Sequence, residues 1–178
     1  MLVDFPGVMT EFAKVKSGEF FIYFEDSQAA LAMKIFDAVS PEKKVGVMSF
    51  STAIHPSMTP PTVLDSGQLF QNRAVCVVRD VVIRPPFQMN KVRSNSPSLD
   101  RPGPIIFAIG ATYIRPYDRR GTIDIDLATG ATEESRAHPG SIWLDDWEIV
   151  WVGRFEEKIL CERGKPAAAA QVGPKSGG

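Results

Sequence analysis

The residues best suited to chemistry in this sequence are carboxylates in its last third. Asp124 and Asp126 alternate along the segment GTIDIDL, so they would share one face of a half-exposed strand. A second acidic cluster follows in a tryptophan-rich segment and contains Asp145, Asp146 and Glu148. Paired carboxylates can act in acid–base catalysis or bind Mg²⁺ or Ca²⁺, but neither cluster has the spacing of an EF-hand loop. We therefore expect solvated acidic surface here and keep a carboxylate site as the alternative.

The residue types that most often act as nucleophiles or metal ligands are scarce. His55 and His138 each precede a proline, and neither has a cysteine, aspartate or second histidine at metal-ligand spacing. Cys76 and Cys161 lie in apolar, strand-like runs, where a thiol usually packs as a small hydrophobic side chain. The chain has no Walker loop, dinucleotide-binding glycine motif or nucleophile elbow. We expect no metal, no cofactor and no catalytic residue.

Charge is strongly segregated along the chain, although the net charge is only −1. Residues 73–120 carry nine basic and three acidic side chains, whereas residues 121–163 carry four basic and ten acidic ones. Such asymmetry is more informative about partners than the net charge is.

The basic segment is the main candidate for a binding surface. Its positive side chains would form a rim for phosphate, a nucleic-acid backbone or an acidic protein surface. The candidates are Arg84, Lys91, Arg93, Arg101, Arg115, Arg119 and Arg120. Two alternatives stay open. The charges pair internally with the acidic segment across neighbouring strands, or the positive and negative patches of separate copies meet head to tail.

Three tryptophans, Trp143, Trp147 and Trp151, recur every fourth residue. This spacing predicts one aromatic stripe, because it places the rings on one face of either a strand or a helix. Packing in a core or an interface accounts for such a stripe. A platform that stacks bases or sugars is the alternative, and the neighbouring acids argue against nucleic acid there.

The elements that must position these residues are short strands. With 14 prolines and 14 glycines, the composition favours many short elements joined by turns. Residues 74–83 are expected to form one strand with a bulge near Arg79 and Asp80. Strands are predicted over 11–16, 19–25, 29–36, 45–51, 74–83, 105–114, 121–127, 141–152 and 154–163. The predicted fold is therefore mainly β with little helix, an antiparallel β-barrel or β-sandwich.

Proline-rich segments suggest how these strands are grouped. We predict an N-terminal β-meander over 1–52, a proline-rich connection over 53–73 and a second β-unit over 74–163 that includes a long loop at 85–104. These would be two small β-subdomains. The tail, 164–178, is small, polar and predicted to be disordered.

One short echo links two predicted strands. Both Arg84 and Arg115 follow an isoleucine and precede a proline. Proline cannot donate to a sheet and holds the preceding residue extended, so both motifs predict the end of a strand.

These observations favour a non-catalytic role. No run of 18 apolar residues predicts a membrane helix, and the N-terminus lacks the pattern of a secretory signal, so we expect a cytoplasmic protein without a membrane partner. The main hypothesis is a binding or assembly module that contacts a protein partner, or another copy, through segregated charged surfaces. The alternatives are a small-ligand-binding or enzymatic β-barrel with a carboxylate site, and a module that binds nucleic acid or another polyanion through residues 73–120.

Overall fold

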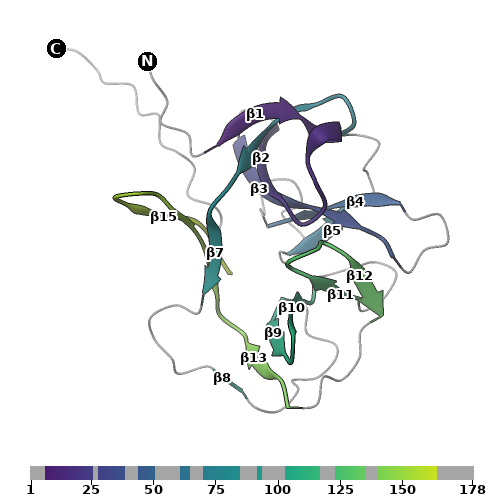
Figure 1. Cartoon of the computed structure of the whole chain (residues 1–178), viewed down its shortest axis with the longest axis vertical. Helices are drawn as coiled ribbons and strands as arrows, with labels where there is room; N and C mark the ends of the chain where they lie inside the picture. Colours follow the sequence, from purple (N-terminus) through teal and green to yellow (C-terminus); the bar gives the residue numbers. More distant parts are fainter. Residues whose placement is uncertain are drawn as a thin grey trace.

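The structure is a computed structural model (Figure 1). It describes residues 7–25, 28–38, 44–50, 61–64, 70–84, 92–93, 103–116, 123–134 and 140–163. Within these ranges the prediction of a mainly β fold with little helix is confirmed. The described strands form three separate antiparallel sheets, each with its own edge strands, and not one closed barrel. No helix in the described ranges is long and apolar enough to cross a membrane.

Sheet A contains six strands and takes up the N-terminal part of the chain, drawn in purple, blue and teal in Figure 1. Its order is β1 (Val8–Glu11), β6 (Ala74–Val78), β2 (Phe20–Glu25), β3 (Gln28–Phe36), β4 (Val45–Ser49) and β5 (Thr62–Leu64). Because β6 pairs with both β1 and β2, hydrogen bonds of this sheet cross the boundary that we expected between residues 73 and 74.

Both faces of sheet A are covered, which explains why β2 is apolar almost throughout. Phe20 and Ile22 enter the main core. Phe21 and Tyr23 point to the other face, where they pack with Phe12 in a second cluster. A strand buried on both faces gains from large side chains at every position, so the run EFFIYFE needs no alternation.

A buried lysine explains why the strand predicted over 11–16 is wrong. Strand β1 ends at Glu11, and a short 3₁₀ helix, η1 (Phe12–Lys14), follows. The Lys34 ammonium donates to the carbonyl oxygens of Val15 at 2.6 Å and Phe12 at 3.2 Å. Burial lowers the pKa of Lys34, and these carbonyl oxygens offset part of the cost of burying its charge. The turn is thus held by a residue distant in sequence.

The other two sheets are built from the second half of the chain, apart from β7. Sheet C follows the order β12 (Thr132–Glu134), β11 (Ile123–Asp126), β10 (Ala111–Ile114), β9 (Ile105–Ala108), β13 (Ile142–Leu144) and β8 (Val92–Arg93). Sheet B has three strands, β15 (Glu157–Glu162), β14 (Glu148–Val152) and β7 (Val81–Arg84). The main core contains side chains from all three sheets, so it ties them together.

Three predicted strands are broken by turns. Residues 74–83 split into β6 and β7 of different sheets, because Asp80 adopts a left-handed conformation with φ of 56°. Residues 105–114 form the hairpin β9–β10, which turns at Gly110 with φ of 80°. Residues 141–152 split into β13 and β14. An apolar run predicts extended backbone, but it does not report where the chain leaves one sheet for another.

Short strands also occur where connections were predicted. β5 lies within 53–73, and β8 lies within 85–104. The predicted tail, 164–178, lies outside the described residues.

Candidate functional site

The predicted basic rim is described only in part. Arg84 and Arg115 are described in full, and Arg93 is placed by its backbone opposite Trp143 in sheet C. The remaining candidates, Lys91, Arg101, Arg119 and Arg120, lie outside the described residues. The rim as a whole therefore stays a prediction, and Arg84 and Arg115 are the two members whose side-chain contacts the structure describes.

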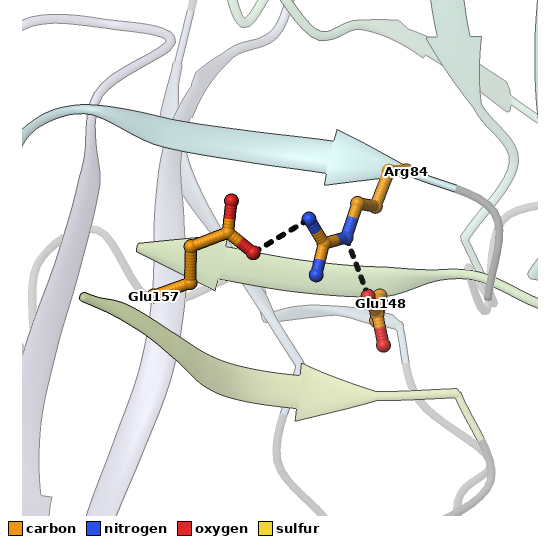
Figure 2. Close-up of polar contacts among 3 residues, drawn as sticks. All are labelled: Arg84, Glu148 and Glu157. Carbon is orange, nitrogen blue, oxygen red and sulfur yellow. Dashed lines mark hydrogen bonds and ion pairs between the residues drawn. The ribbon is translucent and has the colours of Figure 1, made fainter. Parts of the chain in front are cut away.

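Arg84 is the centre of a charged network on sheet B (Figure 2). It is the last residue of β7 and lies directly opposite Glu148 of β14. Its Nε donates to Oε1 of Glu148 at 2.6 Å, and its Nη1 donates to Oε2 of Glu157 at 2.8 Å. Since Glu157 belongs to β15, one guanidinium joins all three strands of the sheet, and we call these three residues the Arg84 network.

The members of the Arg84 network differ in their contact with solvent. The Glu148 side chain is only 11% exposed, whereas that of Glu157 is 51% exposed. The hydrogen bond to Glu148 makes the largest contribution to raising the pKa of Arg84, and the hydrogen bond to Glu157 makes the next largest. Glu148 also faces Glu162 across the β14–β15 pair, and like charges in that arrangement repel each other. Arg84 offsets this repulsion on the side where Glu148 is buried.

Apolar side chains surround the network on the same side of the sheet. The strand register places Val82, Val152 and Ile159 on the side of Arg84, and we call this side the outer face of sheet B. Val82 is 46% exposed and Ile159 is 50% exposed. The opposite side packs into the main core through residues such as Ile149. The outer face therefore combines exposed branched aliphatic side chains with an ion-pair network.

A tight hairpin joins β14 and β15. Gly153 donates its backbone N–H to the carbonyl of Glu156, which closes a tight turn. Phe155 in this turn is 89% exposed, and the Arg154 guanidinium lies 5.1 Å from the centre of its ring. An aromatic ring so exposed contributes little to the stability of the fold.

Arg115 has a different role from Arg84. Its Nε and Nη2 donate to the two carboxylate oxygens of Asp124 at 2.7 and 3.0 Å, and both side chains are buried. The guanidinium lies 4.9 Å from the centre of the Trp143 ring. The expectation that Asp124 lies on an exposed strand face is therefore wrong. Internal pairing, one of the alternatives for the basic segment, is what the structure shows for Arg84 and Arg115.

The two predicted acidic clusters do not come together as paired carboxylates. Asp126 accepts the backbone N–H groups of Ala128 and Thr129 and so stabilises the β11–β12 turn, while Asp124 binds Arg115. Asp145 lies 3.8 Å from the Arg163 guanidinium, and Asp146 lies in the turn after β13. Glu148 belongs to sheet B. Across the described ranges, no group of three or more histidine, cysteine, aspartate or glutamate residues could hold a metal ion.

The predicted tryptophan stripe is not one surface. Trp143 packs in a small cluster with Ile106 and Tyr113 of sheet C. Trp147 and Trp151 belong to the main core instead, and the Trp147 indole donates to the Gly103 carbonyl. The prediction fails because the chain turns between β13 and β14. Across that turn, a spacing of four residues no longer places side chains on the same face.

Both cysteines are buried and free, as predicted. The Cys161 thiol donates to the carbonyl of Phe50, and burial raises its pKa to about 12. Burial also raises the pKa of Cys76. Neither thiol is poised as a thiolate nucleophile, because nucleophilic cysteines have lowered pKa values.

Sequence reasoning missed Glu157 and the exposed apolar residues of the outer face. Side chains that alternate along β7 and β14 indicate that sheet B has two faces. Only the register with β15 shows that Glu157 contacts Arg84. Comparisons with protein-family models, with curated proteins and with solved structures each find no match to this chain.

Proposed function

We propose that this chain is a non-catalytic binding or assembly module that contacts a partner chain through the outer face of sheet B. The observation that supports the proposal is the combination on one sheet face of exposed Val82, Val152 and Ile159 with the Arg84 network. Exposed apolar side chains that cluster beside charged groups are typical of protein contact surfaces.

The proposal differs in one respect from the hypothesis of contact through segregated charges alone. Arg84 and Arg115 are each bonded to carboxylates of the same chain. Their charge is therefore already compensated, and the affinity for a partner would come mainly from apolar burial on the outer face. The charges on that face would set the orientation and choice of the partner.

The geometry gives less support to the other two functions. A carboxylate enzyme site would need Asp124 and Asp126 to act together, but they bind separate groups. Binding of a polyanion would need free arginines. Arg84 and Arg115 are held by carboxylates, which leaves the exposed Arg73 and Arg79 for this role among the basic side chains described between residues 73 and 120.

Light scattering over a range of protein and salt concentrations tests whether the chain associates with itself. Pull-down with the purified chain as bait tests for another partner. The informative variant is Ile159→Thr, because threonine keeps the β-preference and removes apolar surface. Ile109→Thr is the matched control, since Ile109 is exposed at the β9–β10 turn of sheet C. We expect the chain to bind either another copy or a recovered partner. Ile159→Thr should weaken that binding, and Ile109→Thr should leave it unchanged. A monomer at every salt concentration, with no partner recovered, would contradict the proposal.

A further inference from the structure

We infer that the outer face of sheet B binds a partner segment that is aliphatic and positively charged. This inference rests on the proposed function, because it names the chemistry of the partner at the same surface. It follows from three features of the face: its apolar centre, its excess of negative over positive charges, and an interruption in one of its two edge strands.

The apolar centre calls for aliphatic side chains on the partner. Val150 in the middle strand is fully buried, so its neighbours provide the exposed apolar surface: Val82 opposite it on β7 and Val152 two residues further along β14. Ile159 faces Val150 from β15 and is half-exposed. These branched side chains form a ridged surface with no aromatic ring of its own, so small branched or linear apolar side chains would pack against it best.

The charges call for a cation on the partner. The Arg84 network contains one positive and two negative groups, so it has a formal charge of −1. A carboxylate can accept about four hydrogen bonds. Half of the Glu157 side chain is open to solvent beside the bond from Arg84. A lysine or arginine of the partner would therefore find an acceptor at Glu157 without displacing Arg84.

The same charges disfavour the binding of a second copy of this chain to the outer face of sheet B. In a two-fold contact the same patch of each chain meets itself. Two networks with a formal charge of −1 would then be brought together in a partly dehydrated contact, where like charges repel most strongly. A partner with a basic segment avoids this repulsion.

The β15 edge of sheet B indicates that the partner packs on the face and does not add a strand beside β15. β15 is one of the two edge strands of this sheet among the described strands, and β7 is the other. Its register with β14 shifts between Ile149 and Val150, which leaves Leu160 opposite no residue. A bulge of this kind interrupts the row of backbone groups that an added strand would need.

Fluorescence anisotropy with two labelled peptides tests the inference. One octapeptide alternates valine and lysine, and the other alternates valine and glutamate. We expect the lysine peptide to bind more tightly, with an affinity that falls as salt rises. Glu157→Gln should weaken its binding by about twofold to fivefold, the range of one exposed ion pair. Ile159→Thr should weaken it at least as much.

Matched variants show whether the peptide binds at this face. Glu134→Gln removes an exposed carboxylate from β12 of sheet C, and Ile109→Thr removes an exposed apolar side chain from the β9–β10 turn. Neither should change the affinity. Equal effects of Glu134→Gln and Glu157→Gln would overturn the inference, because the peptide would then bind by general attraction to acidic surface.

The remaining outcomes separate this inference from the proposed function. If neither peptide binds but light scattering shows self-association that Ile159→Thr abolishes, the occupant is a second copy. The inference then fails and the proposed function stands. Tighter binding of the glutamate peptide would overturn the inference in the same way. If neither peptide binds, light scattering shows a monomer throughout and no partner is recovered, both are wrong.

Discussion

Arg84 and Arg115 occupy the same local sequence, between an isoleucine and a proline, and both lie across from a carboxylate of the neighbouring strand. Arg84 is directly opposite Glu148. Arg115 meets Asp124 one step beyond the pair formed by Ile114 and Ile125. Their surroundings differ, because the Arg115 pair is buried against Trp143 while Arg84 lies half-exposed on the outer face of sheet B.

The position of each strand in its sheet accounts for this difference. β10, which leads to Arg115, lies between β9 and β11 in the middle of sheet C. β7, which carries Arg84, is an edge strand among the described strands of sheet B. Local sequence therefore determines that the strand ends and that an arginine is presented there. The wider sheet determines whether that charge is buried in the fold or stays part-exposed on a sheet face.

The largest expected effect comes from breaking the buried pair. Asp124→Asn removes the negative charge beside Arg115 and leaves a positive charge buried without its counter-ion. We expect the free energy of unfolding, measured by urea denaturation, to fall by about 3–5 kcal/mol. A loss below about 1 kcal/mol would show that solvent reaches Arg115 and that the two arginines are less different than the structure indicates.

A double variant is the matched control for that loss. Arg115→Met combined with Asp124→Leu removes both charges and keeps apolar volume. Because replacing a buried ion pair by apolar side chains is often neutral or stabilising, we expect this variant to be more stable than Asp124→Asn alone.

The second-largest effect is expected from Cys161, a buried thiol on the side of sheet B that packs into the main core. Burial raises the pKa of Cys161 from 9.0 to about 12. Between these values the folded chain keeps a proton that the unfolded chain loses, so stability is fully present below pH 9 and falls as pH rises. At pH 10.5 this thiol alone should lower the free energy of unfolding by roughly 2 kcal/mol.

Cys161→Ser tests this assignment, since serine does not titrate in the range. Burial also raises the pKa of Tyr23 to about 12, and that contribution is present in both proteins. Above pH 9, the free energy of unfolding of the variant should therefore fall less steeply with pH than that of the wild type, but it should still fall. An unchanged slope between pH 9 and 10.5 would mean that Cys161 is not the group responsible.

The sequence predicted more of the fold than of the site, for a physical reason. Aromatic and β-branched runs such as β2 indicate extended backbone directly, because they fit a pleated and buried surface. The break at Asp80 depends on one residue with a left-handed backbone, which no periodicity reports. The burial of Asp124 depends on Arg115 and on the Trp143 ring beside that arginine, and these residues come together only after β11, β10, β9 and β13 have paired.

The same limit applies to the candidate site. Arg84 was recognisable as a positive charge at a strand end, and Glu148 as one of several acids. The contact with Glu157 spans three strands of sheet B, so it requires the register of both pairings. Exposure of Val82 and Ile159 requires knowing which face of the sheet packs into the core.

A smaller effect is expected from breaking the network at Arg84. Arg84→Met leaves Glu148, which is largely buried, opposite Glu162 without a compensating charge. We expect the midpoint of thermal unfolding to fall by about 3 °C, much less than for Asp124→Asn. The difference from the wild type should shrink in high salt, because exposed charges are screened. A loss as large as that of Asp124→Asn would remove the distinction between the two arginines.

The smallest effect on stability should come from Glu157→Gln, although this residue is central to the proposed contact. Its side chain is half-exposed, so the midpoint of thermal unfolding should shift by about 1 °C or less. A double-mutant cycle should give stronger coupling of Arg84 to Glu148 than to Glu157, because Glu148 is the more buried partner. Equal coupling energies would contradict this division. Stronger coupling to Glu148 would mean that Glu148 holds Arg84 in place, so that Glu157 could bond to the proposed partner's cation at little cost to the fold.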